Sequence, residues 1–588
     1  VSDNTTGSSA IGNSTTNGLA VGAGNLTRAG SGTVASLGNL QQMGADSIAV
    51  TSGSSIGSFQ EGTRGSIYGN NNYALSLTSA VTGNTLSAVA KGNVADGSRA
   101  NAYGNTLTAS GTNLVDTGTA PSAASYGADG QAAAGAFVLQ SNQSSTTGIR
   151  NATVTDGFIG NRTSAYFSGN LMSVSDNVLT AEASDNYASN RLGLDFGNLT
   201  TTAMLQNAQQ STATMASTAS NAEIGVDAVS NMGKDSVTVA HDTVNASAVA
   251  NTAANRLDLT AANGLGGNAQ DAATFGIPGG YRGAASSAAS GALALADYGL
   301  LNAQNRSGGD VTASIDTAKV GVFAGGYFDE RDLSPYTTSN NDAVATINDN
   351  TVSAFAQGNS ADSRLVLGAG SIDATAALYN LQAMLSNVDA SATGIDIGLQ
   401  TAGSMSLTGA TVSPVQGAVM PVTVTGNNVE SSARLNDANN VLSATSDSTI
   451  AGSGGDTGAS NDASRFDGFA GAVADFAVAN GQVSIGSASA SLADVTAGVF
   501  AGSAAVAGDI GSDAGQSSLT VSDNSFAAQA SGVPADNGVL LDGASSVSAS
   551  AAVNNQQVLA GGAIGADVSC IPVAAGNLVG STGAITMA

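Results

Sequence analysis

The chain has 588 residues, with 16 Lys and Arg against 43 Asp and Glu, so its formal net charge is −27. This acidity argues against binding to nucleic acid or to an anionic membrane surface, because both depend on clustered basic side chains. No apolar stretch is long enough for a membrane-spanning helix, and a single cysteine excludes an intrachain disulfide framework. Charged residues make up only 10% of the chain and aromatic residues 4%, so we expect a Ser, Thr, Asn and Gly surface over a slim interior filled by small side chains.

One pattern recurs seven times from the first residue onward. An apolar residue is followed by a polar pair ending in Asn, then by apolar residues at every second position, then by a second Asn-marked turn. Irregular spacing around a constant motif is typical of a repeated structural unit with loops of different lengths. We therefore predict one continuous repeat array over residues 1–588, with units 1–80, 81–173, 174–238, 239–346, 347–423, 424–520 and 521–588.

The alternation of apolar residues predicts strands. In the copy that starts at Val174, Leu179, Ala181 and Ala183 lie two residues apart, so they share one face of an extended segment while the residues between them face water. The inward side chains are too small for a thick sandwich core. We predict an all-β fold, an elongated parallel β-solenoid (β-helix) built from irregular repeats with Asn and Gly corners.

Asn residues beside Asp or Gly mark the expected corners at both ends of each alternating segment. Asn and Gly tolerate left-handed backbone conformations, and Asn can also cap its own turn. Stacked Asn side chains can hydrogen-bond from one coil to the next and so satisfy polar groups inside the turn. The predicted structural corners are Asn84, Asn93, Asn177, Asn186, Asn350, Asn359, Asn427 and Asn524.

A looser pattern of Asn and Gln clusters follows each main copy. Since solenoid coils commonly use about 20 to 30 residues, we expect several coils in each unit and about 20 to 29 coils in the chain. Residues 376–385 could form a helix on propensity, although their Asn and Gln residues favour a stacked ladder equally. The first copy is weakened, as terminal repeats often are. In the second copy the register holds through Ala95 and then slips by one residue.

The densest polar and aromatic cluster lies in the longest interval between copies. Aromatic and charged residues in a loop on a rigid scaffold often make contacts with partners, so we predict a contact loop against another subunit, with an ordinary surface loop as the alternative. Its residues are Tyr327, Phe328, Asp329, Glu330, Arg331, Asp332 and Tyr336.

The lone histidine and the lone cysteine offer little chemistry. His241 falls at a turn without visible partners for a catalytic triad or a metal site, so we expect a solvated turn residue. Cys570 is expected to be buried as a small apolar side chain, with an intermolecular disulfide as the alternative. The Asp-Asn corners carry oxygen ligands that suit Ca²⁺, but Asx turns explain them without metal. We expect no cofactor, with Ca²⁺ as the alternative.

The Asn-cornered alternating strands, the later Asn and Gln clusters and motifs such as Thr82-Gly83-Asn84 resemble those of secreted bacterial β-solenoid adhesins and fibre proteins. Among these, the chain is somewhat similar to the holdfast-anchor proteins of stalked bacteria. The resemblance implies a secreted, cell-surface location and a role in attachment or scaffolding, and it carries over no catalytic residue. Because the numbering begins at Val1 rather than Met, we also expect that a signal peptide has been removed.

These features favour a structural protein over an enzyme. We expect a subunit of an extracellular or cell-surface filament that assembles end to end with copies of itself, because solenoid ends expose unpaired strand edges. Cell-surface polysaccharide or an outer-membrane anchor would be further partners. The alternative is a monomeric surface adhesin or polysaccharide-binding rod. A β-helical polysaccharide-degrading enzyme would need clustered carboxylates, which only residues 329–332 approach.

Overall fold

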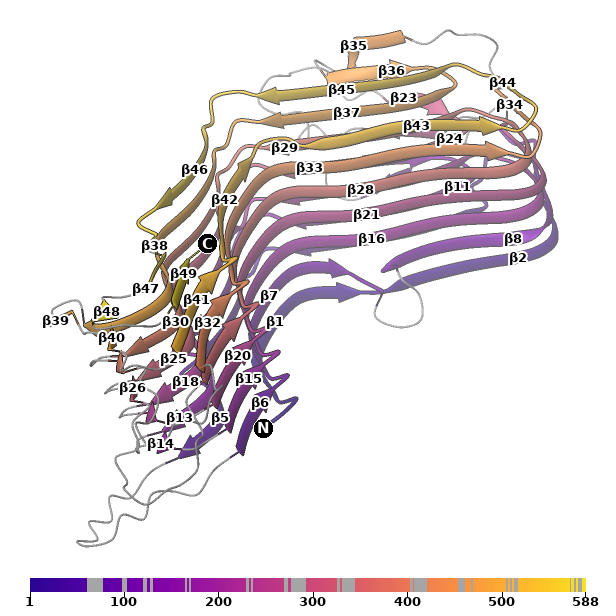
Figure 1. Cartoon of the computed structure of the whole chain (residues 1–588). Coiled ribbons are helices and arrows are strands. Elements are labelled where there is room, and N and C mark those ends of the chain that lie inside the picture. The colour runs from indigo at the N-terminus through magenta and orange to yellow at the C-terminus, as the bar shows by residue number, and fades with distance from the viewer. Residues whose placement is uncertain are drawn as a thin grey trace, which may run out of the picture.

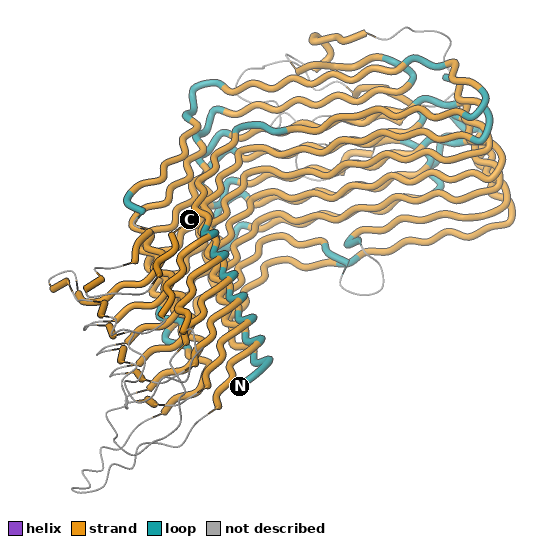
Figure 2. The backbone as a smooth tube through the Cα atoms, viewed as in Figure 1, coloured by secondary structure: helices purple, strands orange, loops and turns teal. Residues whose placement is uncertain are grey.

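The chain is all-β, and its strands stack in parallel into a β-solenoid, which confirms the predicted fold class (Figures 1 and 2). This architecture comes from a computed structural model. The described part of the chain contains no helix long and apolar enough to cross a membrane. The structure describes all residues except 61–77, 98–102, 120–123, 127–130, 164–166, 169–170, 229–231, 234–235, 269–272, 277–291, 325–327, 330–343, 402–404, 407–419, 453–459, 467–468, 504–505, 508–509, 512–516, 572, 576–577, 580–583 and 588.

Each sequence repeat forms one complete coil. Val81 pairs with Val174, Val174 pairs with Val239, and the same register continues from coil to coil as far as Val521. Stacked positions lie between 65 and 108 residues apart in sequence. The expectation of coils of about 20 to 30 residues is therefore wrong, because the Asn and Gln clusters belong to a different side of the same coil. The solenoid has fewer and wider coils than we predicted.

A coil passes through five parallel sheets, which we number I to V in the order in which the chain visits them (Figure 1). Sheet I contains β6 (Thr78–Thr82), β15 (Leu171–Ser175), β20 (Ser236–Ala240), β27 (Val344–Asn348), β32 (Met420–Thr425), β41 (Ser517–Ser522) and β49 (Ala584–Met587). Sheet II contains β1 (Thr5–Thr15), β2 (Asn17–Arg28), β7 (Thr85–Ala95), β8 (Asn105–Asp116), β16 (Val178–Thr200), β21 (Thr243–Gly266), β28 (Thr351–Asp373), β33 (Asn428–Ser446), β34 (Thr449–Ala451), β42 (Ser525–Ser531), β43 (Ala535–Gly543) and β44 (Ser546–Ser548).

The remaining parallel sheets return the chain to its starting side. Sheet III contains β3 (Ala35–Met43), β11 (Phe137–Ser145), β17 (Ala203–Ser211), β24 (Tyr298–Arg306), β29 (Ala376–Met384), β37 (Phe476–Ser484) and β45 (Ala551–Leu559). Sheet IV contains β4 (Ser47–Ser52), β5 (Ser55–Gln60), β12 (Ile149–Thr155), β13 (Phe158–Thr163), β18 (Thr214–Ala228), β25 (Val311–Ala324), β30 (Val388–Thr401), β38 (Ala488–Ser503), β46 (Ile564–Ser569) and β47 (Val573–Ala575), with β39 (Val506–Ala507) antiparallel to β38. Sheet V contains β14 (Phe167–Ser168), β19 (Met232–Gly233), β26 (Phe328–Asp329), β31 (Met405–Ser406), β40 (Ile510–Gly511) and β48 (Leu578–Val579).

Two small antiparallel sheets lie outside the coils. They contain β9 (Ala124–Tyr126), β10 (Gln131–Ala134), β22 (Ala273–Gly276) and β23 (Ala292–Ala296) in one sheet, and β35 (Ser460–Phe466) and β36 (Phe469–Val473) in the other. These strands belong to insertions between sheets II and III in the second, fourth and sixth coils. The described residues Ala133 and Ala296 pack with Met204, Leu301 and Tyr379 of sheet III, so sheet III is buried on both faces in the middle coils. Residues 376–385, for which a helix was one option, lie largely in β29 of this sheet.

Sheet II bends where the second Asn of each motif lies. β16 continues from Val178 to Thr200, but its inward and outward alternation changes at Asp185 and Asn186, which are both buried. The second set of predicted corners, Asn93, Asn186 and Asn359, therefore lies at a bend within a strand and not beyond a strand end. The bend can be followed from coil to coil in Figure 1.

At the first corner of each coil, one residue makes the turn and the next residue supplies the side chain of the ladder. The residue before the corner amide adopts a φ between 54° and 69°, a left-handed conformation that Gly, Asn and Asp tolerate best. The next side chain turns inward and joins a ladder. The left-handed positions are Asp3, Gly83, Asp176, His241, Asp349, Gly426 and Asp523.

The second coil carries an insertion, so the predicted one-residue slip is wrong. Ala95 pairs with Ala188, and Asn105 pairs with Asn190. The chain therefore advances ten residues between these two pairs in the second coil, but only two residues in the third coil. Leu107 pairs with Leu192 and is fully buried, so it takes the interior position that Leu192 holds in the third coil. A sequence pattern without gaps could not place this excursion.

Sheet IV contains a stacked row of glycines that the sequence analysis missed. Gly160, Gly225, Gly321 and Gly398 have φ between 138° and 155°. A Cβ on Gly225 would lie 1.9 Å from the backbone oxygen of Gly321, and the same close approach recurs along the row. Only glycine allows these backbones to stack at this turn.

Candidate functional site

Buried amide side chains form hydrogen-bonded ladders along the stack. At the first corner, Asn84 Nδ2 donates to Asn177 Oδ1 at 3.0 Å, and Asn350 Nδ2 donates to Asn427 Oδ1 at 2.9 Å. At the bend, Asn186 Nδ2 donates to Asn251 Oδ1 of the next coil at 2.8 Å. The predicted corner residues Asn84, Asn93, Asn177, Asn186, Asn350, Asn359, Asn427 and Asn524 all take part in these ladders.

The ladders have a direction, and the Asn ladder of the first corner runs opposite to the Gln ladder that extends from Gln41 to Gln557. Asn4 Nδ2 donates toward the second coil, and Asn427 Nδ2 likewise donates toward the last coil, at Asn524 Oδ1. The Gln ladder of sheet III runs the opposite way, because Gln143 Nε2 donates back to Gln41 Oε1 at 2.7 Å and Gln557 Nε2 donates back to the sixth coil. The stack therefore carries unlike hydrogen-bonding groups at its two ends.

At the first coil, the Asn ladder ends on an acceptor and the Gln ladder ends on a donor. Among the described residues, no hydrogen bond reaches Asn4 Oδ1, whereas Gln41 Nε2 donates only to the Val94 carbonyl. At the last coil, Asn524 Nδ2 donates only to a backbone carbonyl, and no described donor reaches Gln557 Oε1. In each of the two ladders, a donor without a ladder partner at one end of the stack thus corresponds to an acceptor without a ladder partner at the other end.

Apolar side chains are also open at the last coil. Val547, Val553, Leu559, Ile564 and Val568 face inward in register with the sixth coil, yet they are between 38% and 49% exposed. Their register partners in the sixth coil are at most 1% exposed. The difference arises because the described strands have no further coil above them. In the first coil, Ala10, Leu19 and Val21 are only partly buried against the same interior.

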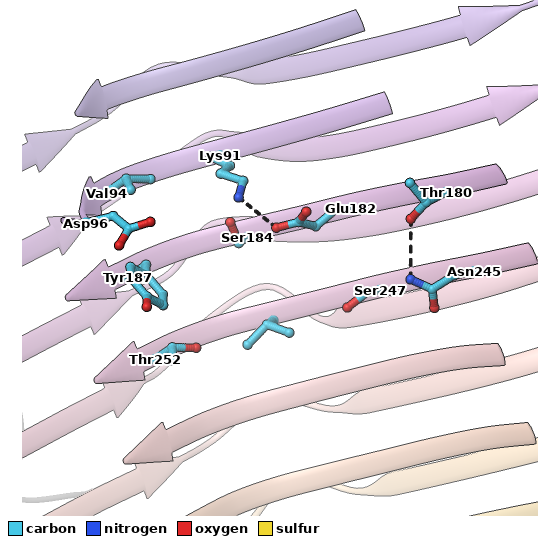
Figure 3. A pocket seen from close by; sticks show the side chains of 11 residues that line it. Lys91, Val94, Asp96, Thr180, Glu182, Ser184, Tyr187, Asn245, Ser247 and Thr252 are labelled. Atoms are coloured by element: carbon cyan, nitrogen blue, oxygen red, sulfur yellow. Dashed lines mark hydrogen bonds and ion pairs between the residues drawn. The ribbon is translucent and has the colours of Figure 1, made fainter. Parts of the chain in front are cut away.

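The outer face of sheet II is hollowed along its bend. A groove of about 440 Å³ lies across the second, third and fourth coils (Figure 3). Its lining is mostly polar and includes Lys91, Asp96, Glu182 and Tyr187, with apolar contributions from two valines. Lys91 Nζ lies 2.8 Å from Glu182 Oε1, and Asn245 Nδ2 donates to Thr180 Oγ1 at 3.3 Å. Burial, together with the nearby Asp96 carboxylate, raises the pKa of the Tyr187 hydroxyl.

Three arginines stack on the same face beyond the bend. Arg191 pairs in register with Arg256, and Arg256 with Arg364, on β16, β21 and β28. Asp258 accepts from Arg191 Nε at 3.1 Å and from Arg256 Nε at 2.7 Å, while Arg364 Nε donates to Asp362 at 3.1 Å. The three side chains are between 41% and 49% exposed. A second hollow of about 240 Å³ lies beside Arg256 and Arg364, with Tyr103 of the second-coil insertion at its edge.

A buried charge cluster stabilises the inner side of the bend. Arg150 Nε lies 2.9 Å from Asp185 Oδ1, both side chains are fully buried, and Ser211 Oγ also donates to Asp185. Arg306 on the fourth coil donates to Ser211 and to backbone carbonyls, and burial lowers the pKa of its guanidinium to about 10. These charges lie away from solvent, so we assign them a structural role.

Asp242 interrupts the first-corner ladder with a carboxyl group. Its Oδ1 accepts from the backbone N and from Nδ2 of Asn177, both at 2.9 Å, while its Oδ2 is buried and has no hydrogen-bond partner. Burial is the main cause that raises the pKa of this carboxyl to about 7, and the neighbouring Asp176 adds to the shift. A protonated Asp242 resembles the Asn that occupies this place in the other coils.

The other predicted sites have different outcomes. Of the predicted contact loop, Tyr327, Glu330, Arg331, Asp332 and Tyr336 lie outside the described residues, and only the backbone of Phe328 and Asp329 is described, as β26 of sheet V. The expectation of a buried cysteine is wrong, because Cys570 is exposed with a φ of 53° at a corner beyond β46. His241 is a turn residue with an exposed side chain, as predicted, and its Nε2 lies 3.6 Å from Asp349 Oδ2.

Metal ligands do not gather in the described part of the chain, where no group of three His, Cys, Asp or Glu side chains could hold an ion. Ca²⁺ binding at the Asp-Asn corners stays a prediction.

Comparisons with known proteins identify no relative. No family model, no curated protein and no solved structure matches the chain.

The arginine stripe was visible in the sequence but was not recognised as a site. Arg191 and Arg256 occupy equivalent places in the two best-matching copies. In a chain with 16 Lys and Arg among 588 residues, an arginine repeated at one register position is a usable signal. The groove at the bend could not be found in this way, because its shape depends on where sheet II bends.

Proposed function

We propose that this protein is the structural subunit of a filament in which the last coil of one copy stacks on the first coil of the next. The observation that carries this proposal is the complementarity of the two ends. Asn524 Nδ2 has a free hydrogen where a stacked copy would place the Asn4 Oδ1 acceptor, and the next copy's Gln41 Nε2 would meet Gln557 Oε1. The donor-to-acceptor direction of both ladders would therefore continue from one copy into the next.

The exposed apolar interior of the last coil also favours a second copy of the chain stacked on it. In the last coil, the side chains of Val553, Ile564 and Val568 are exposed to solvent. Their register partners in the sixth coil are buried because the last coil packs against them. The first coil visits sheets II, III and IV in the same order and carries Leu19, Leu37 and other apolar residues on its inner face. Covering this surface would be favourable by about 25 cal/mol for each Å² of apolar area buried.

Unpaired strand edges add a further driving force. Sheet II ends at β1 and β42, and sheet III ends at β3 and β45, so the described edge strands present backbone groups that can pair with another parallel strand. A head-to-tail contact of this kind is heterologous, and such contacts generate open filaments when the rotation does not close a ring. The filament would act in surface attachment or scaffolding outside the cell rather than in catalysis.

Electron microscopy of the purified chain tests the proposal. We expect unbranched filaments with an axial repeat of about 34 Å, which is seven coils at about 4.8 Å each. Val568→Glu places a charge on the open end of the interior and should leave single particles. Leu171→Glu changes a similarly exposed apolar residue on β15 of sheet I, away from both ends, and should leave filaments intact. Single particles of the unsubstituted chain at all concentrations would refute the proposal.

A further inference from the structure

We propose that the stripe formed by Arg191, Arg256 and Arg364 binds the carboxylate groups of a linear acidic polysaccharide that lies along the stacking direction. The stripe is on β16, β21 and β28 of sheet II, strands that lie away from both ends of the stack (Figure 1), and its side chains are between 41% and 49% exposed. The site is therefore present on a single copy and does not depend on filament formation.

The distribution of positive charge singles out this face. Seven Lys and Arg side chains in the described residues are at least partly exposed, and five of them lie on the outer face of sheet II. The five are Lys91, Arg191, Arg256, Arg364 and Arg434, while the other two, Arg162 and Lys319, lie on sheet IV. In a chain with a net charge of −27, a concentration of this kind requires an explanation.

The two aspartates orient the arginines through their Nε atoms, and Arg256 also hydrogen-bonds to Tyr103. Asp258 lies between Arg191 and Arg256 and accepts at Nε of each, and Asp362 accepts at Nε of Arg364. Three guanidinium groups face two carboxylates, so the stripe retains positive charge. Because the Nε contacts fix the planar groups, the Nη atoms of Arg191 and Arg364 are preorganised to donate two parallel hydrogen bonds to an added carboxylate.

The spacing of the stripe favours an acidic polysaccharide over nucleic acid. Arginines on neighbouring coils repeat at about 4.8 Å, and a polyuronate carries one carboxylate on each sugar ring, a unit of similar length in an extended chain. Duplex DNA carries one charge for about every 1.7 Å and depends on extensive charge neutralisation, which three arginines on an acidic protein do not supply. Tyr103, whose ring centroid lies 5.9 Å from Arg191 Cζ, offers an aromatic surface at the edge of the neighbouring hollow.

Titration calorimetry with size-defined polygalacturonate tests this site on the full chain. We expect saturable binding that weakens as NaCl is raised. The double variant Arg191→Gln and Arg364→Gln should reduce affinity at least tenfold, and it leaves Asp258 paired with Arg256. Arg162→Gln is the matched control, since Arg162 is also an exposed arginine paired with carboxylates, and it should leave affinity unchanged.

The comparison ligands decide between the sources of binding. Dextran tests recognition of neutral sugar, sodium sulfate tests binding of a small anion, and single-stranded DNA tests a different polyanion. Each should bind at least tenfold more weakly than polygalacturonate. The inference is overturned if polygalacturonate does not bind, if any of the three comparison ligands binds as tightly, or if the double variant, with an unchanged circular dichroism spectrum, keeps its affinity.

Discussion

Replacing Asp242 by Asn should stabilise the solenoid at neutral and alkaline pH. In the other coils with an Asn here, the Asn Nδ2 donates along the ladder, but Asp242 places an oxygen without a partner in that position. The ionised carboxylate is buried away from solvent and has no proton with which to donate a hydrogen bond. An Asn side chain restores the missing donor without changing the size of the group.

The magnitude follows from the shift of the Asp242 pKa from 3.8 to about 7. Because the native pKa is raised, the folded state holds the proton more tightly than the unfolded chain does. The protonated group therefore contributes stability that is fully present below pH 3.8 and is lost as pH rises through 7. A shift of about 3 units at 1.36 kcal/mol each corresponds to about 4 kcal/mol.

Urea unfolding followed by circular dichroism at several pH values measures this effect. We expect the two proteins to differ little at pH 4 and Asp242→Asn to be more stable by up to about 4 kcal/mol at pH 8. Asp156→Asn serves as the control for removing a carboxylate, because Asp156 is exposed and its left-handed corner accepts Asn equally well. A stability difference between wild type and Asp242→Asn that is independent of pH would refute the reasoning.

Two further substitutions probe the bend and the glycine row. Arg150→Gln leaves Asp185 buried and unpaired, so chemical denaturation should show a loss of about 3 to 5 kcal/mol, whereas Lys91→Gln at the exposed pair with Glu182 should cost at most about 1 kcal/mol. Equal losses would contradict the structural role of the buried pair. Gly225→Ala drives a Cβ into the Gly321 oxygen and should cost at least about 2 kcal/mol. Gly22→Ala, where the added Cβ meets open space, should change the melting temperature little, and a similar fall in both variants would argue against the close approach.

The strand pattern of this chain could be predicted from sequence because its inward residues alternate with period two. Leu179, Ala181 and Ala183 are fully buried on one face of β16, as their spacing indicates. Asn177 takes part in a ladder because a buried corner needs its polar group satisfied at each coil. Such signals are local, so a single copy of the motif is sufficient to show them.

The size of the coil could not be predicted in the same way. Gln209 belongs to a cluster that we assigned to a separate coil, yet its Nε2 donates to Gln143 of the preceding coil and to the Asn186 carbonyl of its own coil. Nothing local distinguishes a strand that turns into the next sheet from one that begins a new coil. The insertion after Ala95 was hidden for a related reason, since small polar residues suit both an edge loop and a strand.

Disulfide trapping between copies tests the proposed stacking most directly. Ser9 and Gln529 hold the same register position in the first and last coils and face outward. Within one copy they are separated by about 29 Å, or six coil spacings, but a stacked copy brings them to about 4.8 Å, within the reach of a disulfide.

In a Cys570→Ser background, oxidation of the Ser9→Cys and Gln529→Cys double variant should produce a ladder of covalent multimers. Ser9→Cys alone should yield at most dimers, and Ser9→Cys with Leu540→Cys, which is out of register on β43, should not form the ladder. Monomers from the in-register pair, or equal multimer formation by both pairs, would contradict head-to-tail stacking of the coils.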